Sequence, residues 1–301
     1  TADSAAALLE SAAHGSLAWH ADDPRRHLAV ATSAPKGVGT LLYYRSRRNF
    51  VDPEYIGARL GDKILYGFIL ATLYWAEGSK QRSEQNVFNT AGLLWFTVIL
   101  PGYGAAAYIP QLVLERPVFL REAADGCYAS YTYLVAKMLE EFACILPFSL
   151  AFCGALYGAI QLQGSFWVLW LVNYLMGCWG VAVAYWVAAI SPNVEAANAI
   201  LPTYVTTNLI FCGYLIILSD IPLAWRWYSW ADPFTYAWIA VMKNNFRPVT
   251  GEAFADQAND VIDYYDLRRA PGIWGSIGIL AVFVLGFILL AAHAVHKLIS
   301  K

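Results

Sequence analysis

Six stretches of this chain are long and apolar enough to cross a lipid bilayer, and this feature constrains the fold more than any other. A helix that crosses the hydrocarbon needs about 20 mainly apolar residues at a rise of about 1.5 Å each. The stretches are residues 56–76, 88–109, 134–160, 166–190, 197–218 and 273–297. Hydrophobic residues make up 58% of the 301 residues and charged residues only 14%, which exceeds the apolar content that a soluble core needs. The sequence therefore predicts an all-α integral membrane protein with six transmembrane helices.

The distribution of Lys and Arg predicts the orientation of these spans. Positive residues near the ends of a span are retained on the cytoplasmic side. Those around the first stretch are Lys36, Arg45, Arg47, Arg48, Arg59 and Lys63. An even number of spans returns the C-terminus to the same side. Basic residues near that end are His293, His296, Lys297 and Lys301. We therefore expect both termini in the cytosol, although Arg268 and Arg269 lie on the other side, within an acidic loop.

The segment before the first span divides into two parts. Residues 1–36 are alanine-rich and hold no apolar run long enough to span, and the chain begins at Thr1, so we interpret them as a flexible linker from a longer protein. Residues 39–50 alternate Leu and Tyr with Arg, a pattern typical of a helix that lies along a membrane surface. Asp52-Pro53-Glu54 then starts the first span, because Asp caps a helix, Pro fits its first turn and Glu favours the positive end of its dipole.

Several short motifs follow one another in a definite order along the chain. After the amphipathic stretch and Asp52-Pro53-Glu54 come Asn89-Thr90-Ala91-Gly92, Glu115-Arg116-Pro117-Val118-Phe119-Leu120-Arg121-Glu122, Tyr133-Leu134-Val135-Ala136-Lys137, Phe211-Cys212-Gly213-Tyr214-Leu215, Ile221-Pro222, Asp232-Pro233-Phe234-Thr235-Tyr236 and Asn244-Asn245-Phe246. In this order they resemble the transmembrane domain of the G subfamily of ATP-binding cassette transporters, over residues 37–301. The resemblance implies a half-transporter of the plasma membrane that dimerises with a second one and exports lipids, sterols or amphipathic xenobiotics.

The resemblance also implies a nucleotide-binding domain that precedes the spans and binds ATP and Mg. A loop of the form G-x-x-x-x-G-K-[ST] would be needed to hold the phosphates, and neither Gly37-Val38-Gly39-Thr40 nor Gly78-Ser79-Lys80 fits it. We expect this chain alone to bind no cofactor and to hydrolyse no ATP. His293 and His296 lie three residues apart with no third ligand nearby in sequence, so no metal site is expected.

The charged segment from Glu115 to Glu122 must lie outside lipid. By resemblance it is the coupling helix that transmits force from the nucleotide-binding domain. The resemblance assigns ion pairs with that domain and with the interfacial helix to Glu115, Arg116, Arg121 and Glu122, and a docking contact with the domain to Phe119. The alternative is an ordinary solvated loop between the second and third spans.

The substrate path, by resemblance, lies between two copies and is lined by the second and fifth spans. In the second span it would be lined by Phe96, Ile99, Leu100 and Tyr103, whose spacing of three and four places them on one helical face. In the fifth it would be lined by Val205, Thr206 and Leu209. The alternative is that these side chains pack within their own subunit. Pro101-Gly102 should kink the second span.

The segment after the fifth span carries two further features. The resemblance assigns Tyr214 and Leu215 to a gate above the path, and the alternative for Tyr214 is a place in the outer aromatic belt. Residues 225–238 combine many aromatic residues with Pro233, which predicts re-entrant helices rather than a straight span.

Polar residues at or within the spans are the remaining candidates. Lys137, Glu140 and Glu141 open the third span, where Lys137 and Glu141 could pair at a spacing of four, or all three could form a polar relay. Asn173 and Asn208 are expected to bridge helices.

One function of another class stays open. A secondary transporter or channel driven by an ion gradient would need an acid near the bilayer midplane, and Glu140 and Glu141 lie nearer the cytosolic end. Expected partners are membrane lipids and an amphipathic cargo, and the net charge of −2 gives no reason to expect nucleic acid.

Overall fold

Every regular element in the described part of the chain is a helix. The computed structural model describes residues 32–80, 84–105, 109–246 and 255–299, so most of the expected linker lies outside the described residues. Within these ranges no strand occurs. The predicted all-α class is therefore confirmed.

Four helices of the described chain are long and apolar enough to cross a membrane. They are α5 (Glu84–Gly104), α7 (Ser130–Ile160), α8 (Phe166–Ile190) and α13 (Ile273–Ile299). They coincide with the second, third, fourth and sixth predicted spans. Helices α4 (Pro53–Leu73) and α9 (Val194–Phe211) lie where the first and fifth spans were expected. They are not apolar enough to count as candidate spans by the same criterion. The reason is polarity, since α4 carries Arg59, Asp62 and Lys63 while Glu195 and two Asn lower the mean hydropathy of α9.

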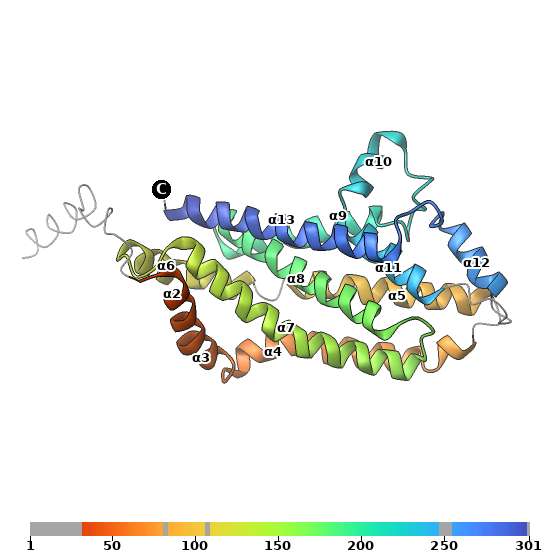
Figure 1. Ribbon diagram of the computed structural model, residues 1–301, viewed down its shortest axis with the longest axis horizontal. Coiled ribbons are helices and arrows are strands. Elements are labelled where there is room, and N and C mark those ends of the chain that lie inside the picture. Colours follow the sequence, from red (N-terminus) through yellow and green to blue (C-terminus); the bar gives the residue numbers. More distant parts are fainter. Residues whose placement is uncertain (1–31, 81–83, 106–108, 247–254, 300–301) are drawn as a thin grey trace, which may run out of the picture.

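Helix α8 lies at the centre of the bundle, with the other long helices running alongside it (Figure 1). It packs on α7, α13, α5 and α11 (Pro233–Asn245). Its sequence is apolar on all sides, which is typical of a buried helix. A Cβ added at Gly180 would lie 3.0 Å from the Ala105 Cβ and 3.1 Å from the Pro101 carbonyl oxygen, so this glycine allows the chain around the end of α5 to approach closely. Asn173 Nδ2 donates to the Thr97 carbonyl at 2.8 Å, which confirms the bridge expected between two spans.

One end of the bundle carries short helices that slant across the long axis, beside the C-terminal end of α13 (Figure 1). They are α2 (Ala34–Leu41), the π-helical turn η2 (Leu42–Ser46), α3 (Arg47–Asn49) and α6 (Ile109–Ala124). The amphipathic stretch expected at residues 39–50 is thus helical, but it begins earlier, at Ala34. Helix α2 packs on α7, so one side of this segment is held by the bundle.

The opposite end carries α10 (Leu223–Trp230), α11 and α12 (Ala255–Tyr264), with a short 3₁₀ turn η3 (Glu77–Lys80) after α4. The two aromatic-rich helices α10 and α11 differ in burial. Residues of α11 are almost all buried against α13, α8 and α5, whereas α10 projects from the bundle and exposes Trp225, Trp227 and Trp230 (Figure 1). Asp232 caps α11 by accepting a bond from the Phe234 N–H at 2.9 Å.

Candidate functional site

Helix α6 contains the motif that was expected to be the coupling helix, and it is longer than the motif. Pro117, Val118 and Arg121 are exposed on it, and Val118 is 47% exposed. Phe119 is only 2% exposed, with its ring centroid 4.4 Å from that of Tyr133. Phe119 therefore docks into its own chain, which corrects the expectation that it contacts a nucleotide-binding domain. The apolar side chains of this motif that face outward are Pro117 and Val118.

The C-terminal end of the motif forms an ion pair with the segment at residues 39–50 that was expected to lie along the membrane surface. Arg45 on η2 donates from Nη2 to both carboxylate oxygens of Glu122 at 2.9 Å, and the Tyr128 hydroxyl donates to the same carboxylate. Burial alone would lower the pKa of Arg45, but the Glu122 carboxylate and other nearby groups raise it overall. Burial and the hydrogen bond to Glu122 raise the pKa of Tyr128. The ion pair expected between Glu122 and the interfacial helix is present.

Arg116 has a different role from the one expected. Its Nη2 donates to the carbonyl oxygens of Ala188 at 3.0 Å and Ser191 at 2.8 Å, at the C-terminal end of α8. A cation there satisfies carbonyls that have no intrahelical partner and favours the negative end of the helix dipole. Arg116 thus holds α6 against the junction of α8 and α9 instead of forming an outward ion pair.

A second group of charges joins α6 to α7. Lys137 Nζ lies 2.9 Å from the Glu115 Oε2 and 3.8 Å from the Glu140 Oε2. The Tyr133 hydroxyl also approaches Glu115, at 3.4 Å. Lys137 is buried, so these carboxylates offset the cost of removing its charge from water.

The third group lies deeper and joins α7 to α4. Arg59 and Glu141 form an ion pair in which the side chains are 2% and 1% exposed, with Nε 2.9 Å from Oε2. The Tyr55 hydroxyl donates to Glu140 at 2.9 Å and to Glu141 at 3.2 Å. The Asn49 amide donates to Glu140 at 2.7 Å. The pair expected between Lys137 and Glu141 is therefore wrong, because each has a partner from another helix.

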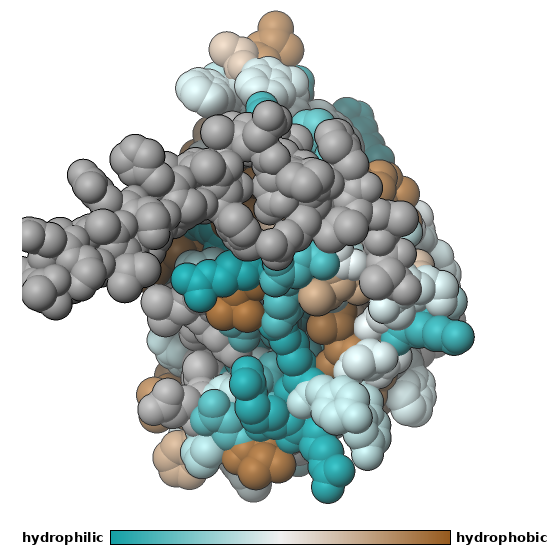
Figure 2. Space-filling model, turned by 90° about the vertical axis from the view of Figure 1, so that its left-hand side faces the viewer, coloured by the Kyte–Doolittle hydropathy of each residue, from teal (hydrophilic) through white to brown (hydrophobic). Residues whose placement is uncertain are grey.

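These contacts form one set, which we call the charged network. It contains Arg45, Asn49, Tyr55, Arg59, Glu115, Glu122, Tyr128, Lys137, Glu140 and Glu141. It joins η2, α3, α4, α6 and α7 at one end of the bundle. Figure 2 looks onto this end and shows hydrophilic side chains running across it in a band. The acids and Lys137 were candidates from the sequence, and Arg45 and Arg59 were used there only to predict orientation, whereas Asn49, Tyr55 and Tyr128 were missed.

The expected substrate-path residues differ in how far they are exposed. Phe96 is 41% exposed, Thr206 is exposed, and the Tyr103 hydroxyl shares a hydrogen bond with the Thr206 hydroxyl, which joins α5 to α9. Leu100 is half-buried. Ile99, Val205 and Leu209 are buried against helices of their own chain, which is the alternative that the sequence left open.

The two expected gate residues, Tyr214 and Leu215, differ in the direction that their side chains face. Tyr214 turns toward its own chain, where it stacks on Trp95 with ring centroids 4.8 Å apart and on Tyr265 at 6.1 Å. A Cβ added at Gly92 would lie 2.9 Å from the Tyr214 hydroxyl, so this glycine makes room for the ring. Leu215 is 57% exposed. In this conformation only Leu215 faces outward.

Comparison with known proteins relates this arrangement to a family. The family model described as ABC-2 type transporter matches residues 37–246. ABC transporter G family member 37 of Oryza sativa subsp. japonica is 26% identical over 82% of this chain and 17% of its own length. ABC transporter G family member 18 of Arabidopsis thaliana is 29% identical over 68% of this chain and 29% of its own length. ABC transporter G family member STR2 of Medicago truncatula is 25% identical over 74% of this chain and 31% of its own length.

The chain thus spans less than a third of the length of these relatives. The matched residues include most of α2, the charged network, α6 and the other helices up to α11. The chain therefore belongs to the ABC-2 type transporter family and resembles, within it, the transmembrane domains of ATP-binding cassette transporters of the G subfamily.

Proposed function

We propose that this chain is the permease half of an ATP-driven exporter that moves lipids, sterols or amphipathic xenobiotics by alternating access. In this proposal α4 and α9 complete six spans, α10 and α11 are the re-entrant helices, and both termini face the cytosol at the plasma membrane. A nucleotide-binding domain outside this chain binds ATP and Mg. A second half-transporter completes the dimer.

The observation that carries this proposal is the way α6 is held. Glu115, Arg116, Phe119 and Glu122 each attach it to a different part of the chain, namely α7, the end of α8, the aromatic core and η2. Its remaining exposed residues offer a surface to a partner on the same side. A helix that transmits force needs both features, because it must be fixed to the spans and accessible to the domain that moves it.

The face shared by α5 and α9 supports an amphipathic cargo. Phe96 supplies an exposed aromatic surface, and Tyr103 with Thr206 supplies a pair of hydroxyls on the adjoining helices. Such a mixture of apolar area with a few polar groups suits a lipid or sterol that carries a small polar head. In our proposal Ile99, Val205 and Leu209 support this face from behind, and Leu215 forms the outward part of the gate.

The experiment that tests the proposal is the Glu122→Gln variant of the full-length protein in sealed vesicles. Gln keeps the size of Glu but removes the charge that holds Arg45. We expect export of a fluorescent amphipathic dye to fall by about tenfold, the effect of losing one charge-assisted hydrogen bond, while ATP hydrolysis continues. The matched control is Asp263→Asn, which opens an exposed ion pair with Arg268 at the other end of the bundle and should leave both rates unchanged.

Two outcomes would count against the proposal. Unchanged export in Glu122→Gln would mean that α6 does not transmit force through η2. Export that continues without ATP but stops when an ion gradient is collapsed would identify the chain as a secondary transporter instead.

A further inference from the structure

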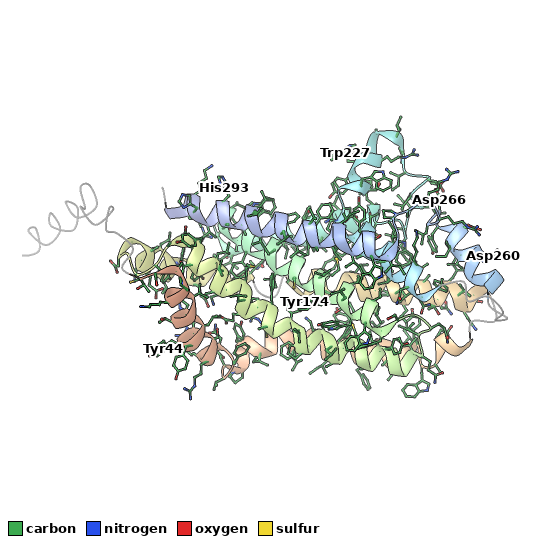
Figure 3. The ribbon with its side chains drawn as sticks, viewed as in Figure 1. Tyr44, Tyr174, Trp227, Asp260, Asp266 and His293 are labelled. Carbon is green, nitrogen blue, oxygen red and sulfur yellow. The ribbon has the colours of Figure 1, made fainter. Side chains whose placement is uncertain are left out.

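The end of the bundle opposite the charged network contains a pocket that no part of the proposed mechanism uses. Its volume is about 330 Å³. It lies between α10, the start of α11 and the segment that leads into α13. Its wall includes Leu218, Arg226, Trp230, Asp266, Arg269 and Ala270. In Figure 3, Asp266 lies between α10, where Trp227 is labelled, and α12, where Asp260 is labelled.

We infer that this pocket binds the anionic head of an amphipathic molecule, a phosphate, carboxylate or sulfate, with the adjoining apolar part of that molecule against Leu218 and Trp230. The inference rests on the proposed function for one point, that this end of the chain is the side on which cargo is released.

The charges that face the pocket favour an anion. Two arginines, Arg226 and Arg269, line it against one carboxylate, Asp266. A third cation stands behind the wall, where Lys243 Nζ donates to the carbonyl oxygens of Ala270 at 2.8 Å and Pro271 at 3.1 Å. Guanidinium groups match phosphate and carboxylate oxygens with paired N–H donors, which explains why this site would select a planar or tetrahedral oxyanion.

Other acids near the pocket already have partners. Asp220, next to the pocket residue Ser219, accepts a hydrogen bond from the Ser219 hydroxyl at 3.4 Å. Asp263 forms an exposed ion pair with Arg268. Asp232 is buried behind the pocket residue Thr235 and accepts bonds from the Phe234 N–H and the Thr235 hydroxyl, so it caps α11. These contacts leave Asp266 as the carboxylate that lines the pocket among the described residues.

The arginine on α10 is oriented by the chain itself. Arg226 Nη2 donates to the Ser219 carbonyl at 3.1 Å and lies 3.5 Å from that of Ile221. A guanidinium has five N–H donors, so these bonds fix its position and leave donors for a ligand. Ordering the group in advance reduces the entropy that a ligand must offset on binding.

The pocket adjoins the proposed gate along the chain. Leu218 follows Leu215 by three residues, and a Cβ added at Gly213 would lie 2.9 Å from the Leu218 Cγ. Gly213 has a φ of 96°, in the region that favours glycine, so the turn that brings Leu218 back to the gate depends on this residue. Cargo that passes Leu215 would therefore meet the pocket wall next.

The test is binding of a short-chain phosphatidic acid to the purified full-length protein, measured by calorimetry without ATP. The comparison ligands are the diacylglycerol of the same chain length, which lacks the anion, and inorganic phosphate, which lacks the apolar part. We expect phosphatidic acid to bind more tightly than either. Arg269→Gln and Arg226→Gln should each weaken its binding by about tenfold or more, the effect of losing charge-assisted hydrogen bonds.

The neighbouring residue provides the matched control. Arg268→Gln removes the same charge from the same loop but from a side chain that pairs with Asp263 outside the pocket, so it should leave binding unchanged. Arg269→Lys, which keeps the charge, should restore part of the affinity. Unchanged binding in the Arg226→Gln/Arg269→Gln double variant would overturn the inference, as would phosphate binding as tightly as phosphatidic acid.

A transport measurement separates the two sources of such a ligand. If the anionic amphipath is itself exported, Arg269→Gln should raise its KM in vesicles. If it is a lipid of the outer leaflet, it should change the export rate of the dye without being exported. Because the binding measurement needs neither ATP nor transport, it can succeed or fail independently of the Glu122→Gln result.

Discussion

The buried ion pair between Arg59 and Glu141 allows a quantitative test of the charged network. Removing one partner leaves the other charge in a site that is almost closed to water. Arg59→Met leaves the Glu141 carboxylate with the Tyr55 hydroxyl at 3.2 Å. Glu141→Leu removes the carboxylate that pairs with the guanidinium but keeps its contacts with the Tyr55 carbonyl at 3.0 Å and with the Tyr55 ring, whose centroid lies 3.4 Å from Cζ. Each single variant should lose about 3–5 kcal/mol of unfolding free energy.

The double variant should behave differently. Arg59→Met/Glu141→Leu removes both charges and fills the space with apolar side chains, an exchange that is often neutral. We expect it to be more stable than either single variant, with a coupling energy of about 3 kcal/mol or more. The assay is unfolding of the full-length protein in mixed detergent micelles, followed by tryptophan fluorescence while the SDS fraction is raised.

The exposed pair of Arg268 and Asp263 is the control, because its side chains are 61% and 49% exposed. Two single variants and the double variant of this exposed pair, measured in the same way, should give a coupling energy of about 0.2–1 kcal/mol. If the buried pair gives no more than the exposed pair, the burial that we describe around Arg59 does not exist in the folded protein.

Three further predictions concern other parts of the chain. Gly78→Ala should lower the melting temperature by several degrees, because its Cβ would lie 2.3 Å from the Gln161 carbonyl oxygen, whereas Gly154→Ala, where no atom lies within 4 Å, should not. Asn244→Ala should cost about 1–3 kcal/mol in the same unfolding assay, since its amide bonds the backbone N–H and C=O of the loop between α7 and α8 at 3.0 and 2.9 Å. A membrane-impermeant maleimide should label Cys127, the exposed cysteine between α6 and α7, only from the cytosolic side, and labelling from the outside would reverse the proposed orientation.

The helices that sequence reasoning located best are those with the longest apolar runs. Helices α5, α7, α8 and α13 were all expected within a few residues, because nothing but a buried or lipid-facing helix accommodates so many apolar side chains. Helix α12 was not predicted. It is short and polar, and its place beside α5 depends on tertiary contacts that leave no periodic signal in so brief a segment.

The charged network shows where sequence reasoning stops. The sequence shows directly the charges between Glu115 and Glu122 and at the start of α7. It also indicates that the segment from Glu115 to Glu122 lies outside lipid. The partners of these charges could not be predicted, because Arg59 and Glu141 lie 82 residues apart and Arg45 and Glu122 lie 77 apart. Local spacing favoured a pair between Lys137 and Glu141, but a weak contact on one helix is easily replaced by stronger ones between helices.

The burial of Phe119 and the bonds of Arg116 change how force would pass through this chain. Both side chains make their contacts within this chain, so in the proposed mechanism a push on Val118 and Arg121 would reach the spans through α6 as a whole rather than through one contact. Since η2, α7 and the end of α8 are joined to α6, and α4 is joined in turn to α7, these elements should move together. Helix α5 contributes no residue to the network, and Pro101 interrupts its hydrogen bonding. In the proposed alternating access, separation of α5 from α9 would have to open the hydrogen bond between Tyr103 and Thr206.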